Sequence, residues 1–454
     1  MAKRSAYRAR KIRMSPTQII ALAFAAIIVL GTLLLLLPVS SRNGRSAGLL
    51  PALFTATSST CVTGLTVADT WSQWSGFGQA VILCMIELGG LGFMSAASLV
   101  VFLFRRKVGL KQRMVMAQAL SLTQMQDVVR LQKWVLLGSL IIQFTGAAIL
   151  FLRFVSGFGV KRALIWGVFH AVSAFCNAGF DIFGYIAPGQ SLITFNNDPV
   201  VCLTLIALIV IGGLGFFVWE EVATTRNFKK FSVYTKLVLI ATAVLVLGGA
   251  LLFLVLEWNN PATLGNMSFG QKLLNALFQS VTLRTAGFAS VDQAMLTDAG
   301  KGVSMLLMLI GGASGSTAGG IKIVTFLVLV MFVVSRARGE RTIHVFSRTI
   351  PQEKALDAMS ISFIVVGLSV FGAVFIASTS PVGFTDGLFE SVSALATVGL
   401  TAGATPLLSA PSKILMILFM YFGRVGVLTL SLGFLMADKA KERFQYAYTN
   451  LLIG

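Results

Sequence analysis

One short pattern occurs four times along the chain, at intervals of about 110 residues. Each copy has small or hydroxyl-bearing residues at helical spacing, then a glycine, then a leucine or a phenylalanine. The copies align without gaps and read FTATSSTCVTGL at residues 54–65, FHAVSAFCNAGF at 169–180, LFQSVTLRTAGF at 277–288 and FESVSALATVGL at 389–400. A regular internal repeat predicts an architecture of equivalent units that pack against one another.

Long apolar stretches flank these copies. Of the 454 residues, 56% are hydrophobic and only 12% are charged, which leaves too little polar surface for a water-soluble chain of this length. Apolar runs of about 20 residues, each able to cross a hydrocarbon core of about 30 Å as a helix, lie at 19–38, 134–152, 237–256 and 361–377. We therefore predict an integral membrane protein.

The flanking sequences define the predicted unit. A long apolar span precedes each copy, and a second, glycine-rich span follows it, with the motifs ELGGLGF at 87–93, VIGGLGF at 210–216, IGGASGS at 310–316 and YFGRVGV at 421–427. The copy itself is too short to span a bilayer, so we interpret it as a re-entrant pore helix followed by a loop, a structure that membranes tolerate only around a cavity.

Two crossings per unit give all four units the same orientation, and parallel repeats are related by an axis along the membrane normal. We predict an all-α integral membrane fold with eight transmembrane helices and four re-entrant pore helices around a central pore. The predicted boundaries are a cytoplasmic N-terminus at 1–15, unit 1 at 16–115, unit 2 at 116–232, unit 3 at 233–345, and unit 4 with a short C-terminus at 346–454.

The formal net charge of +19 is divided among clusters that lie between the apolar spans. Under the positive-inside rule these clusters mark cytoplasmic segments and place both termini in the cytoplasm of a multi-pass cell membrane protein. Contact with lipid headgroups and a docking surface for a cytosolic partner both remain open; the distribution argues against nucleic acid. The clusters lie at 3–13, 105–113, 226–236, 336–348 and 439–443.

The repeated glycines indicate ion chemistry. Potassium filters replace the hydration shell of the ion with backbone carbonyls, which needs an extended loop and a glycine. The fourth copy contains Thr-Val-Gly, the start of a potassium-channel filter, although the second glycine of such filters is replaced in all four copies. The predicted ion-binding residues are Val62, Thr63, Gly64, Asn177, Ala178, Gly179, Thr285, Ala286, Gly287, Thr397, Val398 and Gly399.

Two features distinguish the units. Glycine and serine dominate residues 311–320 of unit 3, which disfavours a continuous helix and predicts a broken helix with a mobile gating loop; a small-residue surface for tight helix packing is the alternative. Arg424 interrupts the glycine pair of unit 4, either as a positive barrier in the pore or as a structural group bound to backbone carbonyls. The predicted gate residues are Gly311, Gly312, Ala313, Ser314, Gly315, Ser316, Thr317, Ala318, Gly319, Gly320, Lys322 and Arg424.

For four other charged residues the sequence suggests one or two roles each. Asp181 either attracts cations at the pore mouth or stabilises a turn, and Arg284 braces its loop, since a cation in the ion path would repel potassium. Glu87 and Glu390 are expected to form hydrogen bonds around the pore helices.

With these residues assembled, the chain resembles the Trk/Ktr/HKT superfamily of potassium transporters over nearly its whole length, most closely the KtrB-type membrane subunit of Ktr systems. The four loops and the GGASGSTAGGIK stretch carry the likeness. The resemblance implies a homodimer with one pore per subunit and a cytosolic ring of nucleotide-binding RCK subunits, which bind ATP/ADP or a dinucleotide. It also places the filter at the four repeated glycines, the gating loop at 311–320 and the pore arginine at Arg424.

The resulting prediction is potassium uptake through a gated pore, with membrane lipid as its surroundings and no covalently bound cofactor. Sodium is open as a coupling ion, which would make the protein a symporter, or as a regulator. A sodium-selective or sodium-coupled transporter of the same fold is the alternative, although glycine in all four filter positions favours potassium. A membrane-embedded enzyme is a weaker alternative, because His170, Glu87 and the scattered cysteines form no obvious catalytic set.

Overall fold

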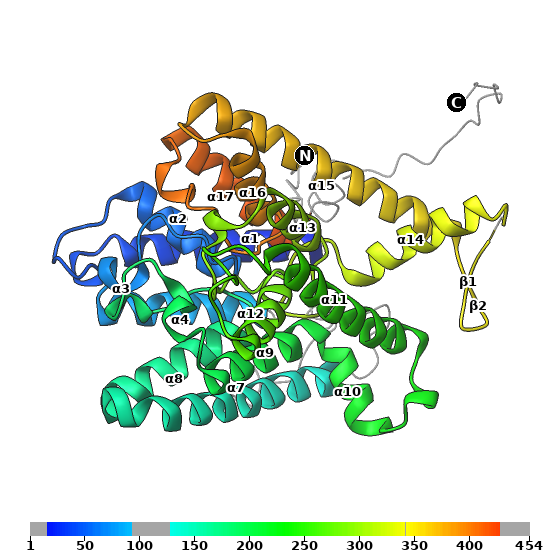
Figure 1. Ribbon diagram of the computed structural model, residues 1–454, viewed down its shortest axis with the longest axis horizontal. Coiled ribbons are helices and arrows are strands. Elements are labelled where there is room, and N and C mark those ends of the chain that lie inside the picture. Colours follow the sequence, from blue (N-terminus) through cyan, green and yellow to red (C-terminus); the bar gives the residue numbers. More distant parts are fainter. Residues whose placement is uncertain (1–15, 93–127, 341, 427–454) are drawn as a thin grey trace, which may run out of the picture.

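The computed structural model describes residues 16–92, 128–340 and 342–426 (Figure 1). The predicted basic clusters at 3–13, 105–113 and 439–443 and both termini lie outside the described residues. The described chain is helical apart from one small antiparallel hairpin, which the sequence did not predict. Its two strands, β1 (Ile343–Val345) and β2 (Arg348–Ile350), pair residue 343 with residue 350.

Four helices in the described residues are long and apolar enough to cross a membrane on their own. They contain the four predicted apolar runs almost completely and extend beyond most of them, so the first span of each predicted unit is confirmed. These helices are α1 (Pro16–Leu35), α7 (Val128–Phe158), α11 (Val233–Glu257) and α15 (Gln352–Thr379).

The repeated pattern itself forms a short helix in each unit, as predicted. Each of these pore helices packs against the long helix that precedes it, and most of the final residues of each are buried. At 12 to 16 residues they are too short to cross a bilayer. They are α2 (Leu49–Thr60), α8 (Val160–Phe175), α12 (Phe269–Thr282) and α16 (Phe384–Leu395).

The second span is broken in units 2 and 3, although the sequence predicted a break only in unit 3, and in units 1 and 4 the described part of this span ends at Gly92 and Gly426. The last glycine of each glycine-rich motif has positive φ, and those of units 2 and 3 lie within the breaks; the four are Gly92, Gly215, Gly315 and Gly426. In unit 2 the chain turns by 96° at the break. The described helices are α4 (Gly76–Gly90), α9 (Pro199–Leu214), α10 (Phe216–Thr225), α13 (Asp298–Leu309), α14 (Ile323–Ala337) and α17 (Ala410–Val425).

Short elements occupy most of the remaining connections. They are η1 (Pro38–Ser40), α3 (Thr70–Gln73), η2 (Phe183–Tyr185), η3 (Ser191–Phe195), η4 (Phe228–Lys230), η5 (Gln293–Met295) and η6 (Thr405–Leu407). Four of them, α3, η2, η5 and η6, follow the four repeated glycines in the chain.

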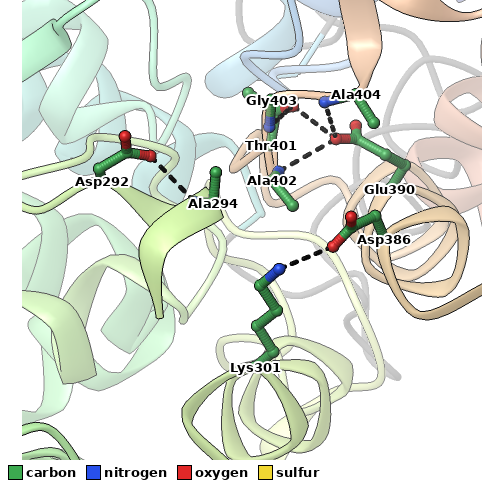
Figure 2. Close-up of polar contacts among 9 residues, drawn as sticks. All are labelled: Asp292, Ala294, Lys301, Asp386, Glu390, Thr401, Ala402, Gly403 and Ala404. Atoms are coloured by element: carbon green, nitrogen blue, oxygen red, sulfur yellow. Dashed lines mark hydrogen bonds and ion pairs between the residues drawn. The ribbon is translucent and has the colours of Figure 1, made fainter. Parts of the chain in front are cut away.

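The four units close into a ring. The second helix of each unit packs against the pore helix of the next: α4 against α8, α9 against α12, α13 against α16, and α17 back against α2. An ion pair between Lys301 of α13 and Asp386 of α16, 2.8 Å long, supports the contact between units 3 and 4 (Figure 2). The predicted all-α membrane fold with four parallel repeats is therefore confirmed, with broken second spans in units 2 and 3.

Candidate ion pathway

The four repeated glycines meet at the centre of the ring. A Cβ atom placed on Gly64 would lie 2.5 Å from the carbonyl oxygen of Ala178, and one on Gly287 would lie 2.7 Å from that of Val398. A Cβ atom on Gly399 would overlap the carbonyl oxygen of Thr63, which returns the series to the first loop. The structure thus brings the twelve predicted ion-binding residues together as four loops whose backbones touch.

The four loops share one backbone conformation. The residue two positions before each glycine is left-handed, with φ of 57° at Val62, 58° at Asn177, 64° at Thr285 and 53° at Thr397. This conformation costs a non-glycine residue about 1–3 kcal/mol and persists where the surroundings enforce it, often at functional sites. The fourfold recurrence of this strain indicates that the loop geometry itself is needed.

Hydroxyl groups at the end of each pore helix hold the loops. The hydroxyls of Ser58 and Ser393 accept from the amides of Gly64 and Gly399, at 3.0 and 3.1 Å. Those of Ser173 and Thr282 donate instead to the carbonyl oxygens of Phe180 and Phe288, at 2.7 and 2.6 Å. The small and hydroxyl-bearing residues of the repeated pattern therefore serve as loop supports.

A second support is present in units 2 and 4. His170 and Glu390 occupy the same position of the repeated pattern, and each accepts from the backbone amide three residues after its glycine: Ile182 to His170 Nε2 at 3.2 Å, and Ala402 to Glu390 Oε1 at 3.1 Å. Glu390 also accepts from the Ala404 amide and from the Thr401 hydroxyl (Figure 2). It accepts from the Thr405 hydroxyl as well. The predicted hydrogen-bonding role of Glu390 is confirmed, whereas that of His170 was missed although the aligned pattern marked its position.

The outer side of the glycine loops is the side toward which the chain continues after each glycine, and the inner side is the opposite one. Residues 311–320, named here the inner loop, lie directly on the inner side of the glycine loops. The Gly319 amide donates to Thr285 Oγ1 at 3.3 Å, and Thr317 Oγ1 donates to the carbonyl of Phe175 at the end of α8 at 3.1 Å. The helix predicted to be broken is indeed broken, because α13 ends at Leu309 and α14 begins at Ile323.

The broken helix of unit 2 holds the inner loop. Because α9 ends at Leu214, its last carbonyls lack helical partners. Those of Gly212 and Gly213 accept from the loop amides of Thr317 and Ala313, at 3.3 and 3.0 Å. Sequence reasoning missed this surface, although its GGLG motif is shared with unit 1.

Two further contacts complete this docking. The amide of Phe216, the first residue of α10, donates to the carbonyl of Gly315 at 2.9 Å, and the hydroxyl of Tyr234 on α11 donates to the carbonyl of Ser314 at 3.1 Å. Unit 2 and the start of unit 3 therefore bind four residues of the inner loop, namely Ala313, Ser314, Gly315 and Thr317.

Arg424 reaches the inner loop from unit 4. Its guanidinium donates to the carbonyl of Thr317 in the loop, and to the carbonyls of Gly89 and Gly90 at the end of α4, the latter at 3.1 Å. Lys322 donates to the carbonyl of Ala318 at 2.7 Å. Of the two roles left open for Arg424, the structure supplies the carbonyl contacts of the structural one, and one of these contacts is to the loop itself.

Three other charged residues singled out in the sequence, Asp181, Glu87 and Arg284, lie in different surroundings. Asp181 accepts from the amide of Phe183 at 3.2 Å, which is the turn-stabilising arrangement. Glu87 accepts from Gln143 at 3.0 and 3.2 Å and from the thiol of Cys176 at 3.4 Å. Arg284 is buried, and its Nε has no hydrogen-bond partner among the described residues, so no bracing contact by Nε is seen.

Comparisons with known proteins agree with this geometry. The sequence profile of a family described as TrkH, cation transport protein, matches residues 3–443. The potassium/sodium uptake protein NtpJ of Enterococcus hirae is 39% identical over 98% of this chain and 99% of its own. The Ktr system potassium uptake proteins B of Bacillus subtilis and Vibrio alginolyticus are 39% and 37% identical, over 95% and 98% of this chain and 96% of each relative.

A solved structure has the same fold. The crystal structure of the potassium transporter TrkH from Vibrio parahaemolyticus superposes with a TM-score of 0.73, over 94% of this chain and 86% of its own. Its sequence identity of 18% limits this likeness to the fold.

Proposed function

The chain belongs to the TrkH family of cation transport proteins, and on this premise we propose that it takes up potassium through its central pore. The ring of four touching glycine loops carries the proposal. Loops of this kind can present carbonyl oxygens to a cation in place of its hydration shell. The ion-binding residues would be the three that end in each of Gly64, Gly179, Gly287 and Gly399.

We further propose that the inner loop is the gate of this pore. It lies against the inner ends of the loops that carry Thr285 and Thr397, and its contacts to unit 2 and Arg424 hold it there. In this arrangement Arg424 acts mainly by holding the loop, and its positive charge adds to the barrier for cations. The inner side would face the cytoplasm, with both termini there.

The regulatory partner is also part of the proposal. Two similar proteins are named as components of a Ktr system, which suggests that this chain works with another subunit. We propose a homodimer bound to a cytosolic, nucleotide-binding RCK ring. The chain has no G-x-G-x-x-G motif of its own, so nucleotide binding would belong to that ring.

Rubidium uptake into proteoliposomes tests the proposal, because rubidium ions resemble potassium in size and charge. We expect uptake that potassium suppresses and that sodium at equal concentration suppresses at least ten-fold less effectively. Equal suppression by sodium would favour the sodium-selective alternative, and uptake no faster than in protein-free liposomes would reject transport. Uptake with and without external sodium shows whether sodium is coupled or regulatory.

A further inference from the structure

Two threonines lie at the inner end of the glycine loops. Thr285 and Thr397 occupy the same position in units 3 and 4, two residues before the glycine, and both are completely buried. Their left-handed backbone is enforced by the packed loops around them. Both hydroxyls face the inner loop, at the place where an ion leaving the glycine ring would next arrive.

The backbone of Gly319 fills that place. Its amide donates to Thr285 Oγ1 at 3.3 Å. A Cβ atom on Gly319 would overlap Thr397 Oγ1 and would lie 3.0 Å from the carbonyl oxygen of Ala396. The oxygens of Thr285, Thr397 and Ala396 thus surround one position. The backbone of a glycine fits there, whereas a residue with a Cβ atom does not.

The hydroxyl of Thr397 differs from that of Thr285 at this contact. Its hydroxyl is buried and has no hydrogen-bond partner among the described residues. A buried polar group without a partner is unfavourable and calls for an explanation, such as an ion that binds in another state. A hydroxyl oxygen has two lone pairs and can coordinate a cation, so the Thr397 hydroxyl is satisfied when a cation replaces Gly319.

We propose that Gly319 and a potassium ion compete for this position, so that ion occupancy of the inner end of the pore opens the inner loop. The inference rests on the proposed transport function and adds a regulation to it. Ion binding and loop opening are then linked: if opening the loop increases the affinity for the ion, a saturating ion concentration increases the closed-to-open equilibrium constant by the same factor. Potassium thus acts as an effector of its own pathway, independently of any cytosolic partner.

The two threonines predict different effects. Thr285→Val removes the acceptor that holds the closed loop, so the loop should open about five-fold more often without potassium, as expected for one hydrogen bond. Thr397→Val removes no hydrogen bond of the closed loop, so the opening of the loop without potassium should be unchanged. It removes an ion ligand, however, and the potassium concentration for half-maximal opening should rise about ten-fold.

Labelling of the inner loop measures its position. Ser314 is a partly exposed residue of the inner loop, so Ser314→Cys gives a reporter. The exposed Cys84 is replaced by serine, and Cys61, Cys176 and Cys202 are buried. The rate at which a small methanethiosulfonate reagent modifies the reporter in the purified protein is followed as potassium replaces choline at constant ionic strength.

We expect potassium to increase the modification rate several-fold. Thr285→Val should raise the rate without potassium about five-fold, and Thr397→Val should raise the potassium concentration for half-maximal modification rate about ten-fold. Thr397→Ser, which keeps the hydroxyl, should restore the wild-type potassium dependence. Thr242→Val is the matched control: Thr242 also has a buried hydroxyl without a partner, but it lies in α11, outside the repeated pattern, and its substitution should change neither rate nor potassium dependence.

Rubidium uptake by the same reporter proteins separates the two proposals. A modification rate that does not change with potassium, or a Thr397→Val variant that responds like the parent, rejects the competition even if uptake is normal. Absence of uptake rejects the proposed transport function. Normal uptake together with a potassium-dependent rate that Thr397→Val weakens and Thr397→Ser restores supports both.

Discussion

The outer and inner halves of the candidate pathway are built in different ways. In the outer half, each pore helix supports its own glycine loop, and the four loops have the same backbone conformation. In the inner half, a single segment of unit 3 is bound by groups from units 2 and 4 and from its own α11. The repeat therefore produces a uniform ring, whereas the differences between units produce one inner segment that is held by contacts from several units.

The contacts of the two halves differ in kind. The glycine loops touch backbone to backbone, so any added atom displaces a neighbouring loop. The inner loop is held mainly by separate hydrogen bonds, each worth about 0.5–1.5 kcal/mol, or about 1.5–3 kcal/mol where a charged group takes part. Substitutions in the outer half should therefore reduce transport or selectivity, and substitutions in the inner half should increase flux.

The largest effect is expected for Gly399→Ala. The new methyl group would overlap the carbonyl oxygen of Thr63, and φ of 93° strains any residue other than glycine. We expect rubidium uptake per molecule in proteoliposomes to fall at least 100-fold. Gly248→Ala is the control, because Gly248 lies in α11 with no atom within 4 Å of the added Cβ. Near-normal uptake by Gly399→Ala would mean that the four loops do not form the ion path.

Arg424→Ala should act in the opposite direction. It removes charge-assisted hydrogen bonds to the inner loop and to the end of α4. Only the bond to the Thr317 carbonyl holds the loop, and its loss should raise uptake without a cytosolic partner about ten-fold. The exposed Arg338→Ala controls for the lost charge. Poor membrane expression with unchanged uptake per molecule would show that Arg424 stabilises the fold but does not hold the gate.

The sequence predicted the outer half well because its signals are local. Apolar runs, pore-helix length and repeated glycines depend on neighbouring residues, and the helix break at residues 311–320 follows from their composition. The break at Gly215 was missed because glycine also occurs inside continuous membrane helices. The break leaves the carbonyls of Gly212 and Gly213 without helical partners, and the inner loop donates hydrogen bonds to them. These contacts join residues about 100 positions apart in the chain.

His170 shows a related limit. A histidine in an apolar pore helix has no sequence signal for its partner, because the Ile182 amide reaches it only after the loop has turned back. Glu390 was easier to interpret, since a carboxylate in an apolar helix must find donors.

Glu390→Gln should have a smaller effect, confined to selectivity. The carboxylate accepts four hydrogen bonds with two oxygens, and glutamine has only one acceptor oxygen, so at least one donor is left unpaired. We expect the preference for rubidium over sodium to fall about five-fold, the effect of roughly one hydrogen bond. Asp386→Asn is the control in the same helix, because its ion pair with Lys301 is partly exposed (Figure 2). A larger flux without loss of selectivity would place Glu390 with the gate and remove the distinction between the two halves.

The smallest effect is expected for Tyr234→Phe, which removes a single neutral hydrogen bond to the Ser314 carbonyl. Uptake without the cytosolic partner should rise about three-fold, whereas Tyr185→Phe on the outer side should leave it unchanged. Combining Tyr234→Phe with Arg424→Ala tests whether the inner loop moves as one body. If it does, both contacts bias the same closed-to-open equilibrium, and their fold-effects multiply until the loop is mostly open. If the double variant transports no faster than Arg424→Ala while that variant is still far from maximal flux, the two ends of the loop open separately. The inner half would then contain two gates instead of one.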